Sequence, residues 1–83
     1  MYRIVFKASA AKQRDSLQAD AKVRVDAKID ELAENPRPAG AKKLKGSDLW
    51  RVRAGDHRIV YSISDGVLLV LVVKIGHRRD IYR

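Results

Sequence analysis

The sequence predicts an α+β fold: an N-terminal strand, a two-helix hairpin and then a three-stranded antiparallel meander, with the helices packed on one face of a small four-stranded sheet. Three observations predict it. The chain has 83 residues, enough for a single domain over 1–83. Apolar residues recur at helical spacing in the first half, and β-forming runs alternate with Gly-Asp and Asp-Gly turns in the second half.

The first strand and the first helix follow from alternation and from a capping residue. β-Forming residues alternate with other residues over Tyr2–Lys7, which predicts a strand. Ser9 is a candidate N-cap, because its hydroxyl can accept a hydrogen bond from an unpaired N–H of the first helical turn. A short helix is therefore expected over about Ala10–Leu17.

The second helix is expected to begin at an Asp20 cap and to continue to about Glu34. Proline at position 36 ends it, because proline disfavours helical geometry in the residue before it. A loop should follow over Ala39–Asp48. The face that packs on the sheet is an apolar stripe with steps of four, three and one residues: Val25, Ile29, Leu32 and Ala33.

The second half of the chain is typical of three strands joined by two tight turns. The expected strands are Trp50–Ala54, His57–Ser64 and Val67–Ile75, with two-residue hairpin loops at Gly55-Asp56 and Asp65-Gly66. Residues 67–73 are apolar at every position. A strand that is apolar on both sides is expected at the centre of a sheet, covered on both faces.

The two tight turns predict a register that gathers three arginines on one face of the sheet. Arg53 should oppose Arg58 directly, and Arg51 shares their face because it lies two residues from Arg53. Leu71 and Val73 are expected beside them. The opposite face, which suits helix packing, should hold His57 together with four apolar or aromatic residues: Trp50, Val52, Ile59 and Tyr61.

Like charges opposed across a sheet are destabilising, so the three arginines need a reason. Each one alone could extend into solvent or pair with Asp48 or Asp80. Together they indicate a phosphate site, because the planar guanidinium matches phosphate in two-point contacts. We therefore predict that this face binds the phosphate backbone of RNA.

The whole chain has a formal net charge of +8, and its basic residues concentrate in the second half. Residues 1–41 hold 8 Lys and Arg against 6 Asp and Glu, whereas residues 42–83 hold 10 against 4. This asymmetry indicates a polyanionic partner: nucleic acid, an anionic membrane or an acidic protein. The alternative is a solubilising surface.

The C-terminal run 76–83 places one histidine, three arginines and Tyr82 close together. Aromatic rings interleaved with cations suit an unpaired base, which stacks on the ring while arginine holds the backbone. An ordinary strand end with Tyr82 in the core is the other interpretation.

Several other classes of protein are not expected. The chain has no cysteine, which excludes disulfides and thiolate metal sites and predicts a reducing cytoplasm. The N-terminus is too charged for a signal peptide, and no apolar run approaches a membrane span. Two histidines on different elements, without a carboxylate cluster, predict no metal site. No cofactor is expected.

Three runs, taken in order and at their spacing, carry a resemblance: Leu44–Gly46, Leu49–Tyr61 and Ile75–Arg83. Together they resemble the RelE branch of the RelE/ParE toxin superfamily, and the resemblance extends over the whole chain. It implies the toxin of a type II toxin–antitoxin pair, an mRNA interferase that cuts mRNA in the ribosomal A site. The ribose 2′-hydroxyl would attack the adjacent phosphate without a metal or a cofactor.

The resemblance also implies roles for individual residues. Arg51 and Arg53 match a basic strand pair that is lysine in the best-known branch, and Arg58 matches a phosphate-clamping arginine. Arg78 matches an arginine that acts as leaving-group acid or phosphate stabiliser. Tyr82 matches a tyrosine that stacks on or orients the nucleotide.

The sequence does not single out one residue as the general base. Arginine is effectively always protonated, so the two strand arginines are poor bases. His77 has the side-chain type best matched to proton transfer near neutrality, and Tyr82 could serve if its pKa lay well below about 10. Charge stabilisation without a strong base is the third option.

The resemblance implies two partners. One is a RelB-like antitoxin, expected to be acidic, in a toxin–antitoxin hetero-oligomer. The other is the ribosome with its mRNA, contacted through five basic residues: Lys42, Lys43, Lys45, Arg79 and Arg83. A ParE-like inhibitor of DNA gyrase and a non-catalytic RNA- or ribosome-binding relative are the alternative functions.

Overall fold

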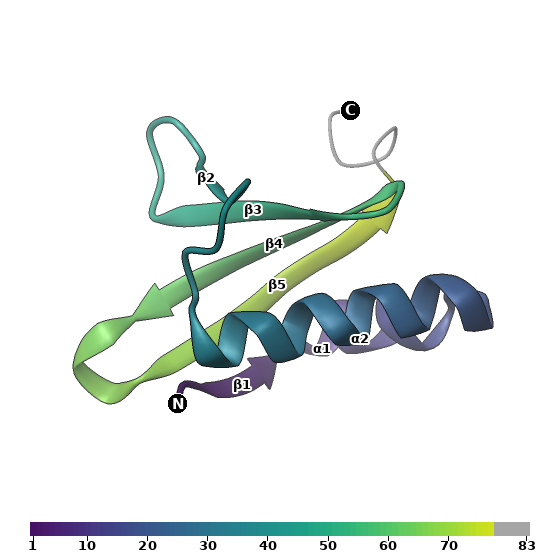
Figure 1. Ribbon diagram of the computed structural model, residues 1–83, viewed down its shortest axis with the longest axis horizontal. Coiled ribbons are helices and arrows are strands. Elements are labelled where there is room, and N and C mark those ends of the chain that lie inside the picture. The colour runs from purple at the N-terminus through teal and green to yellow at the C-terminus, as the bar shows by residue number, and fades with distance from the viewer. Residues whose placement is uncertain (78–83) are drawn as a thin grey trace.

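A five-stranded sheet with two helices on one face forms the body of the protein (Figure 1). The computed structural model describes residues 1–77. The strand order is β1-β5-β4-β3-β2, with β1 parallel to β5 and the other pairs antiparallel. The elements are β1 Arg3–Phe6, α1 Ala8–Asp15, α2 Ala19–Glu34, β2 Lys42–Lys43, β3 Leu49–Ala54, β4 His57–Ser64 and β5 Leu69–His77.

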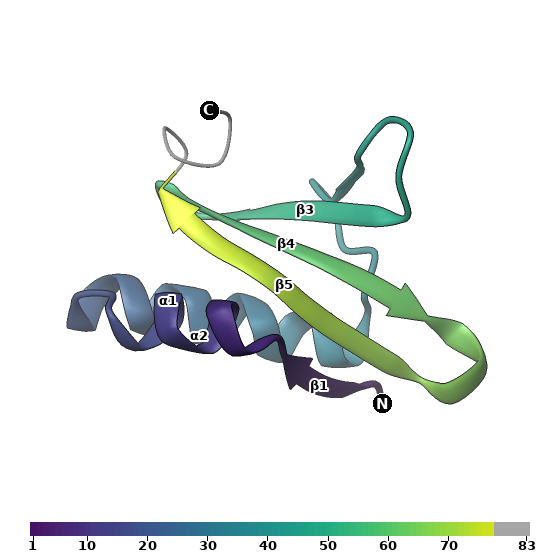
Figure 2. The ribbon, with the colours of Figure 1, turned by 180° about the vertical axis from the view of Figure 1, so that it is seen from behind.

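The predicted α+β fold is confirmed, with one strand more than expected. Lys42 and Lys43, which were expected in a loop, form the two-residue strand β2 at the edge of the sheet. β2 pairs with β3 so that Lys42 opposes Arg51 and Lys43 opposes Trp50. Both helices lie on one side of the sheet, and the view from behind shows the same arrangement (Figure 2). None of the described helices is long and apolar enough to cross a membrane.

Both helices begin before the predicted capping residues. The residues at the N-cap positions are Lys7 and Gln18, so Ser9 and Asp20 lie inside the first helical turns and cap nothing. For α1 the reason is the strand before it, because the Lys7 N–H still donates to the Val72 carbonyl at 2.8 Å. The end of α2 is as predicted, at Glu34 with Asn35 as C-cap.

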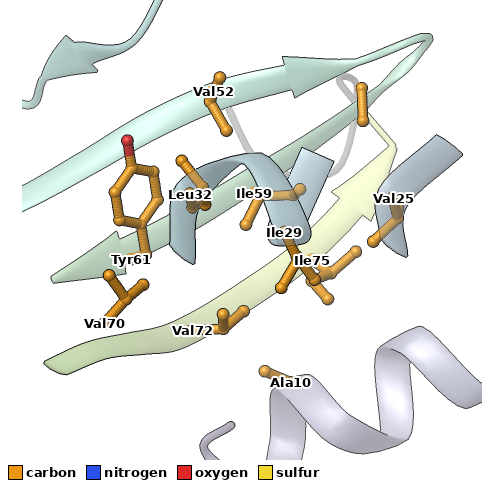
Figure 3. Close-up of a cluster of buried hydrophobic side chains, with 11 residues drawn as sticks. Ala10, Val25, Ile29, Leu32, Val52, Ile59, Tyr61, Val70, Val72 and Ile75 are labelled. Carbon is orange, nitrogen blue, oxygen red and sulfur yellow. The ribbon is translucent and has the colours of Figure 1, made fainter. Parts of the chain in front are cut away.

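The core lies between the helices and one face of the sheet (Figure 3). Three members of the predicted α2 stripe, Val25, Ile29 and Leu32, are buried, whereas Ala33 is half-buried. Val52, Ile59 and Tyr61 are buried from the sheet side, with Trp50 packed against them, which confirms the predicted apolar face.

Tyr61 joins this core to the loop after α2. Its hydroxyl donates a 2.7 Å hydrogen bond to the Pro36 carbonyl, so the buried phenol is satisfied. Burial raises the pKa of Tyr61 to about 12, because a phenolate would be desolvated there.

The turn between β4 and β5 differs from the prediction. A two-residue hairpin turn needs positive φ at its first central residue or at both, and neither Asp65 nor Gly66 adopts it. Instead Asp65–Val67 form a short 3₁₀ turn, Leu68 takes a left-handed φ of 51°, and Ser64 pairs with Leu69. β5 therefore begins at Leu69, two residues later than expected, and continues to His77.

β5 has the predicted central place, between β1 and β4, but it is covered on one face only by the described residues. Val70 and Val72 are fully buried under the helices. Leu69, Leu71 and Val73 on the other face are half-buried. We call this second face of the sheet, which carries no helix within residues 1–77, the open face.

Candidate functional site

Three arginines share the open face, as the sequence predicted. Arg53 on β3 and Arg58 on β4 are direct partners across the strands, and Arg51 opposes Val60 one row away. Together with the loop before β2 they line a hollow of about 350 Å³. Its lining residues are Gly40, Lys42, Arg51, Val52, Arg53 and Arg58, so no carboxylate from residues 1–77 lines it.

The tight turn at Gly55-Asp56 fixes this arrangement. Ala54 pairs with His57, which leaves a two-residue loop and sets Arg53 against Arg58. Gly55 has a φ of +62°, which favours glycine. A Cβ there would also lie 3.2 Å from the Arg24 Cδ atom of α2. The turn therefore holds the arginine pair in register.

The arginines differ in how much solvent reaches them. Arg53 is exposed, whereas Arg51 and Arg58 are half-buried and the Nε atom of Arg58 is shielded from solvent. Positive charge held in a partly desolvated hollow attracts anions more strongly than charge in bulk water. A phosphate in this hollow would meet guanidinium groups from two strands and the ammonium of Lys42.

The predicted lysines separate into two places. Lys42 faces the arginine hollow because β2 pairs it with Arg51. Lys43 and Lys45 line a different hollow, formed by the loop that contains Gly46 and Asp48. Asp48, which the sequence offered as a partner for the arginines, therefore lines that second hollow and not the first.

An ion-pair network that the sequence analysis missed braces the loop leading to Lys42. Arg37 donates two hydrogen bonds to Asp65, at 3.2 and 2.9 Å, and Tyr2 donates a third at 2.6 Å. The Arg37 guanidinium also lies 5.4 Å from the centre of the Trp50 ring. Arg37 thereby ties the loop to β3 and to the β4–β5 turn, and Tyr2, just before β1, binds the same carboxylate. No local pattern marks these contacts, since Tyr2, Arg37 and Asp65 are far apart in sequence.

The network also shifts the pKa values of its members. Hydrogen bonds from Arg37 and then Tyr2 hold the pKa of Asp65 below its ordinary value. The bond to the Asp65 carboxylate raises the pKa of Tyr2, since a phenolate there would lose that bond and face a negative charge. All three side chains are solvent-accessible, so this is a surface network.

His77 lies on the face opposite the arginines. It pairs with His57 across β4 and β5, and the two rings meet edge to face with centroids 5.7 Å apart. Both line a hollow on the helix side, beside Leu17 and Arg24. The predicted position of His57 is thus confirmed, and the geometry does not bring His77 to the arginine hollow as a base.

The expected neighbours of the arginines on β5 were wrong. Because the β4–β5 loop is longer and β5 contains an irregularity, Arg58 pairs with Gly76 and Val60 pairs with Lys74. Leu71 instead pairs with Ser62. Lys74 is therefore a cation of this face that the sequence analysis did not find. Arg78, Arg79, Tyr82 and Arg83 lie outside the described residues, as does Asp80.

The fold and its arginine-lined face define the class of small toxins with the RelE/ParE fold. The chain belongs to the family described as the ParE toxin of type II toxin–antitoxin systems, whose sequence profile matches residues 4–82. An Escherichia coli protein described as a RelE-like toxin is 28% identical over 85 residues, which cover 98% of this chain and 90% of that protein.

Two crystal structures of complexes are similar over nearly the whole chain. The archaeal RelE–RelB complex from Pyrococcus horikoshii contains a chain that matches with a TM-score of 0.82 and 29% identity, covering 93% of this chain and 94% of that one. The intact E. coli RelBE toxin–antitoxin complex matches with a TM-score of 0.80 and 28% identity, covering 93% and 96%.

Proposed function

We propose that this toxin is a ribosome-dependent endoribonuclease that cleaves mRNA in the ribosomal A site. The single observation that supports it most is the hollow on the open face, where Arg51, Arg53 and Arg58 stand together with Lys42. Opposed like charges cost stability, so their retention favours a ligand that carries the opposite charge. A phosphodiester has that charge and fits the guanidinium fork.

The reaction that such a hollow would serve uses a nucleophile from the substrate. The ribose 2′-oxygen attacks the adjacent phosphorus, the bond from phosphorus to the 5′-oxygen breaks, and the 5′-oxygen takes up a proton. Negative charge grows on the phosphoryl oxygens as the attack proceeds. Arginines already in place stabilise that charge without reorganisation, which is the usual source of large rate effects.

The proton on the 2′-hydroxyl needs an acceptor. If the acceptor is weak, the reaction is slower. The three arginines are poor acceptors because they stay protonated. Tyr82 is the proposed residue that stacks on the nucleotide or acts as the base, and Arg78 is the proposed residue at the leaving group. Both roles are carried over from the family. General base catalysis contributes about 10²–10⁴-fold, so positioning and charge stabilisation would carry most of the acceleration.

An acidic antitoxin is the proposed partner. The two similar complexes each pair a RelE chain with RelB. This chain has a formal net charge of +8, and its open face gathers arginines, so an acidic segment would be complementary to it. Ribosomal RNA would be the second anionic partner, through the hollow that contains Lys43 and Lys45 and through Arg79 and Arg83.

The experiment is cleavage of a defined mRNA on translating ribosomes, with the cut position read by primer extension. The wild-type protein should cut within the A-site codon even when a metal chelator is present. The chelator is kept at a concentration that leaves the ribosomes intact. Arg58→Ala should lower the rate at least about 100-fold, the usual loss for one charge-stabilising donor. Lys12→Ala, which removes an exposed charge of α1, should retain the wild-type rate. Cleavage by Arg58→Ala at the wild-type rate would contradict the proposal.

A second candidate function is inhibition of DNA gyrase, because the matching family profile is that of ParE toxins. A supercoiling assay with purified gyrase separates the two candidates. Blocked supercoiling together with intact mRNA on ribosomes would favour the gyrase inhibitor. Normal supercoiling together with A-site cleavage would favour the endoribonuclease.

A further inference from the structure

β5 contains one extra residue opposite the arginine strands. Val72 and Ile75 are both buried in the helix-side core, at 0% and 2% exposure, although they lie three residues apart. In a regular strand, residues three apart point to opposite faces. The register shift lies opposite Val60 and Tyr61: Tyr61 pairs with Val72, and Val60 pairs with Lys74. Val73 is therefore the inserted residue of a β-bulge.

The bulge places Lys74 on the open face. With strict alternation from Val72, Lys74 would point into the helix-side core, where an unpaired ammonium is very unfavourable. In the observed register, Val60 stands between Arg51 on β3 and Lys74 on β5, so all three form one row across the sheet. The three strands lie side by side in both overall views (Figures 1 and 2).

Val60 supports this placement of the two cations. It is only 5% exposed, yet it does not belong to the helix-side core cluster. Something on the open face must shield it, and its cross-strand neighbours there are Arg51 and Lys74. Long charged side chains cover apolar residues with their stems while the charged ends reach solvent. Lys74 is half-buried, as such a stem requires.

The next row leaves space beside this lysine. Arg53, Arg58 and Gly76 are aligned across β3, β4 and β5, so the β5 member of that row has no side chain. Among the described residues, Lys74 forms no ion pair with a carboxylate. The hollow lined by the arginines therefore extends toward β5 past Gly76, which has no side chain, to the ammonium of Lys74.

We propose that Lys74 is a further substrate-contacting residue, whose ammonium binds a phosphate of single-stranded RNA next to the phosphate held by Arg53 and Arg58. This inference rests on the proposed endoribonuclease function. Lysine suits the place because it is a compact point charge on a flexible stem, whereas arginine suits the two-point contact in the hollow. Bulges next to binding sites commonly redirect a side chain in this way.

The test uses variants that separate charge from packing. Lys74→Met keeps the stem over Val60 without the charge, and Lys74→Arg keeps the charge. Lys12→Met is the matched control, since it removes the same charge from an exposed position of α1 on the other side of the sheet. Binding is measured with a single-stranded RNA oligonucleotide whose 2′-hydroxyls are methylated, over a range of salt concentrations. Cleavage on ribosomes is measured in parallel.

Lys74→Met should weaken oligonucleotide binding about tenfold, and the slope of log affinity against log salt should decrease in magnitude by about 0.7. In the cleavage assay it should raise the concentration of ribosome–mRNA complex that gives half the maximal rate and leave kcat nearly unchanged. This is expected for a contact that is equally strong in the ground state and in the transition state. Lys74→Arg should restore most of the loss. Lys12→Met should match the wild type.

The outcomes distinguish this inference from the proposed function. If the wild type cleaves, Arg58→Ala does not, and Lys74→Met equals the wild type in affinity and salt slope, the proposed function stands and the role of Lys74 is wrong. If the wild type neither cleaves mRNA nor binds the oligonucleotide, both are wrong. A loss in Lys74→Met that Lys74→Arg does not restore would also overturn the phosphate contact. Circular dichroism melting curves show whether each variant is folded.

Discussion

Arg53 and Arg58 are direct cross-strand partners, so two guanidinium groups face the same side of the sheet at adjacent positions of β3 and β4. Arg53 is exposed, whereas Arg58 is half-buried with its Nε atom shielded. The pair therefore has an outer member that solvent screens and an inner member that the strands hold. Their opposition has a measurable consequence for stability.

Replacing the outer arginine should stabilise the protein. Arg53→Gln removes one of two opposed like charges, so the free energy of unfolding should rise by about 0.2–1 kcal/mol at low salt. The gain should shrink as salt screens the repulsion. Urea denaturation at two salt concentrations measures both effects, with Lys12→Gln at an exposed position of α1 as the control. Destabilisation by Arg53→Gln would show that the opposed charges are not in conflict.

Substitution of the turn glycine should act in the opposite direction. Gly55→Ala places a Cβ at a φ of +62° and 3.2 Å from Arg24 Cδ, so it should destabilise the protein by about 1 kcal/mol or more. Gly66→Ala is the matched control, because a Cβ there meets nothing within 4 Å and φ is not positive. Equal urea midpoints for the two variants would mean that the Gly55-Asp56 turn carries no strain.

Acid should weaken the network that braces the loop. The pKa of Asp65 is held below its ordinary value, so its contribution to stability is present above the ordinary value and is lost as pH falls through the lowered one. Asp65→Asn should therefore flatten the acid limb of the stability–pH curve below about pH 4. Asp48→Asn, on the separate loop hollow, is the control. If Asp65→Asn lost stability in acid as the wild type does, the acid sensitivity would come from other groups.

Alkali should act through the buried tyrosine. The pKa of Tyr61 is raised to about 12 by burial, so its contribution is present below about pH 10, the ordinary value, and is lost as pH rises toward 12. Ultraviolet difference spectra against Tyr61→Phe should assign to Tyr61 a tyrosinate signal that appears at higher pH than that of an unstructured tyrosine. Simultaneous titration with an unstructured tyrosine would show that Tyr61 is not buried. Tyr61→Phe itself should lose about 1 kcal/mol with the 2.7 Å bond to Pro36.

Sequence patterns within short segments predicted the β3–β4 part of the site, because contacts between residues near in sequence control it. The Gly55-Asp56 turn brings together residues that are near in sequence, so counting from it gave the correct pairing of Arg53 with Arg58. The apolar stripe of α2 and the helix stop before Pro36 are equally local, and the structure places both as predicted.

Long-range contacts control the part that the sequence did not reveal. The β4–β5 turn is shaped where Tyr2 and Arg37 bind Asp65, and these residues lie 63 and 28 positions from it. The longer turn and the bulge then shift β5, so Lys74 and Gly76 replace the expected Leu71 and Val73. The early start of α1 has a similar origin, since the parallel pairing of β1 with β5 ends at Phe6.

The extra residue in β5 also affects how relatives should be compared. A homologue without the bulge would keep the core positions of Val72 and Ile75 only if its chain were one residue shorter between them. An ungapped alignment would then place a core side chain against Lys74 and displace every functional position beyond it by one. Transfer of residue roles from a relative without the bulge would therefore require a gap at Val73, set by the structure of the strand and not by sequence identity.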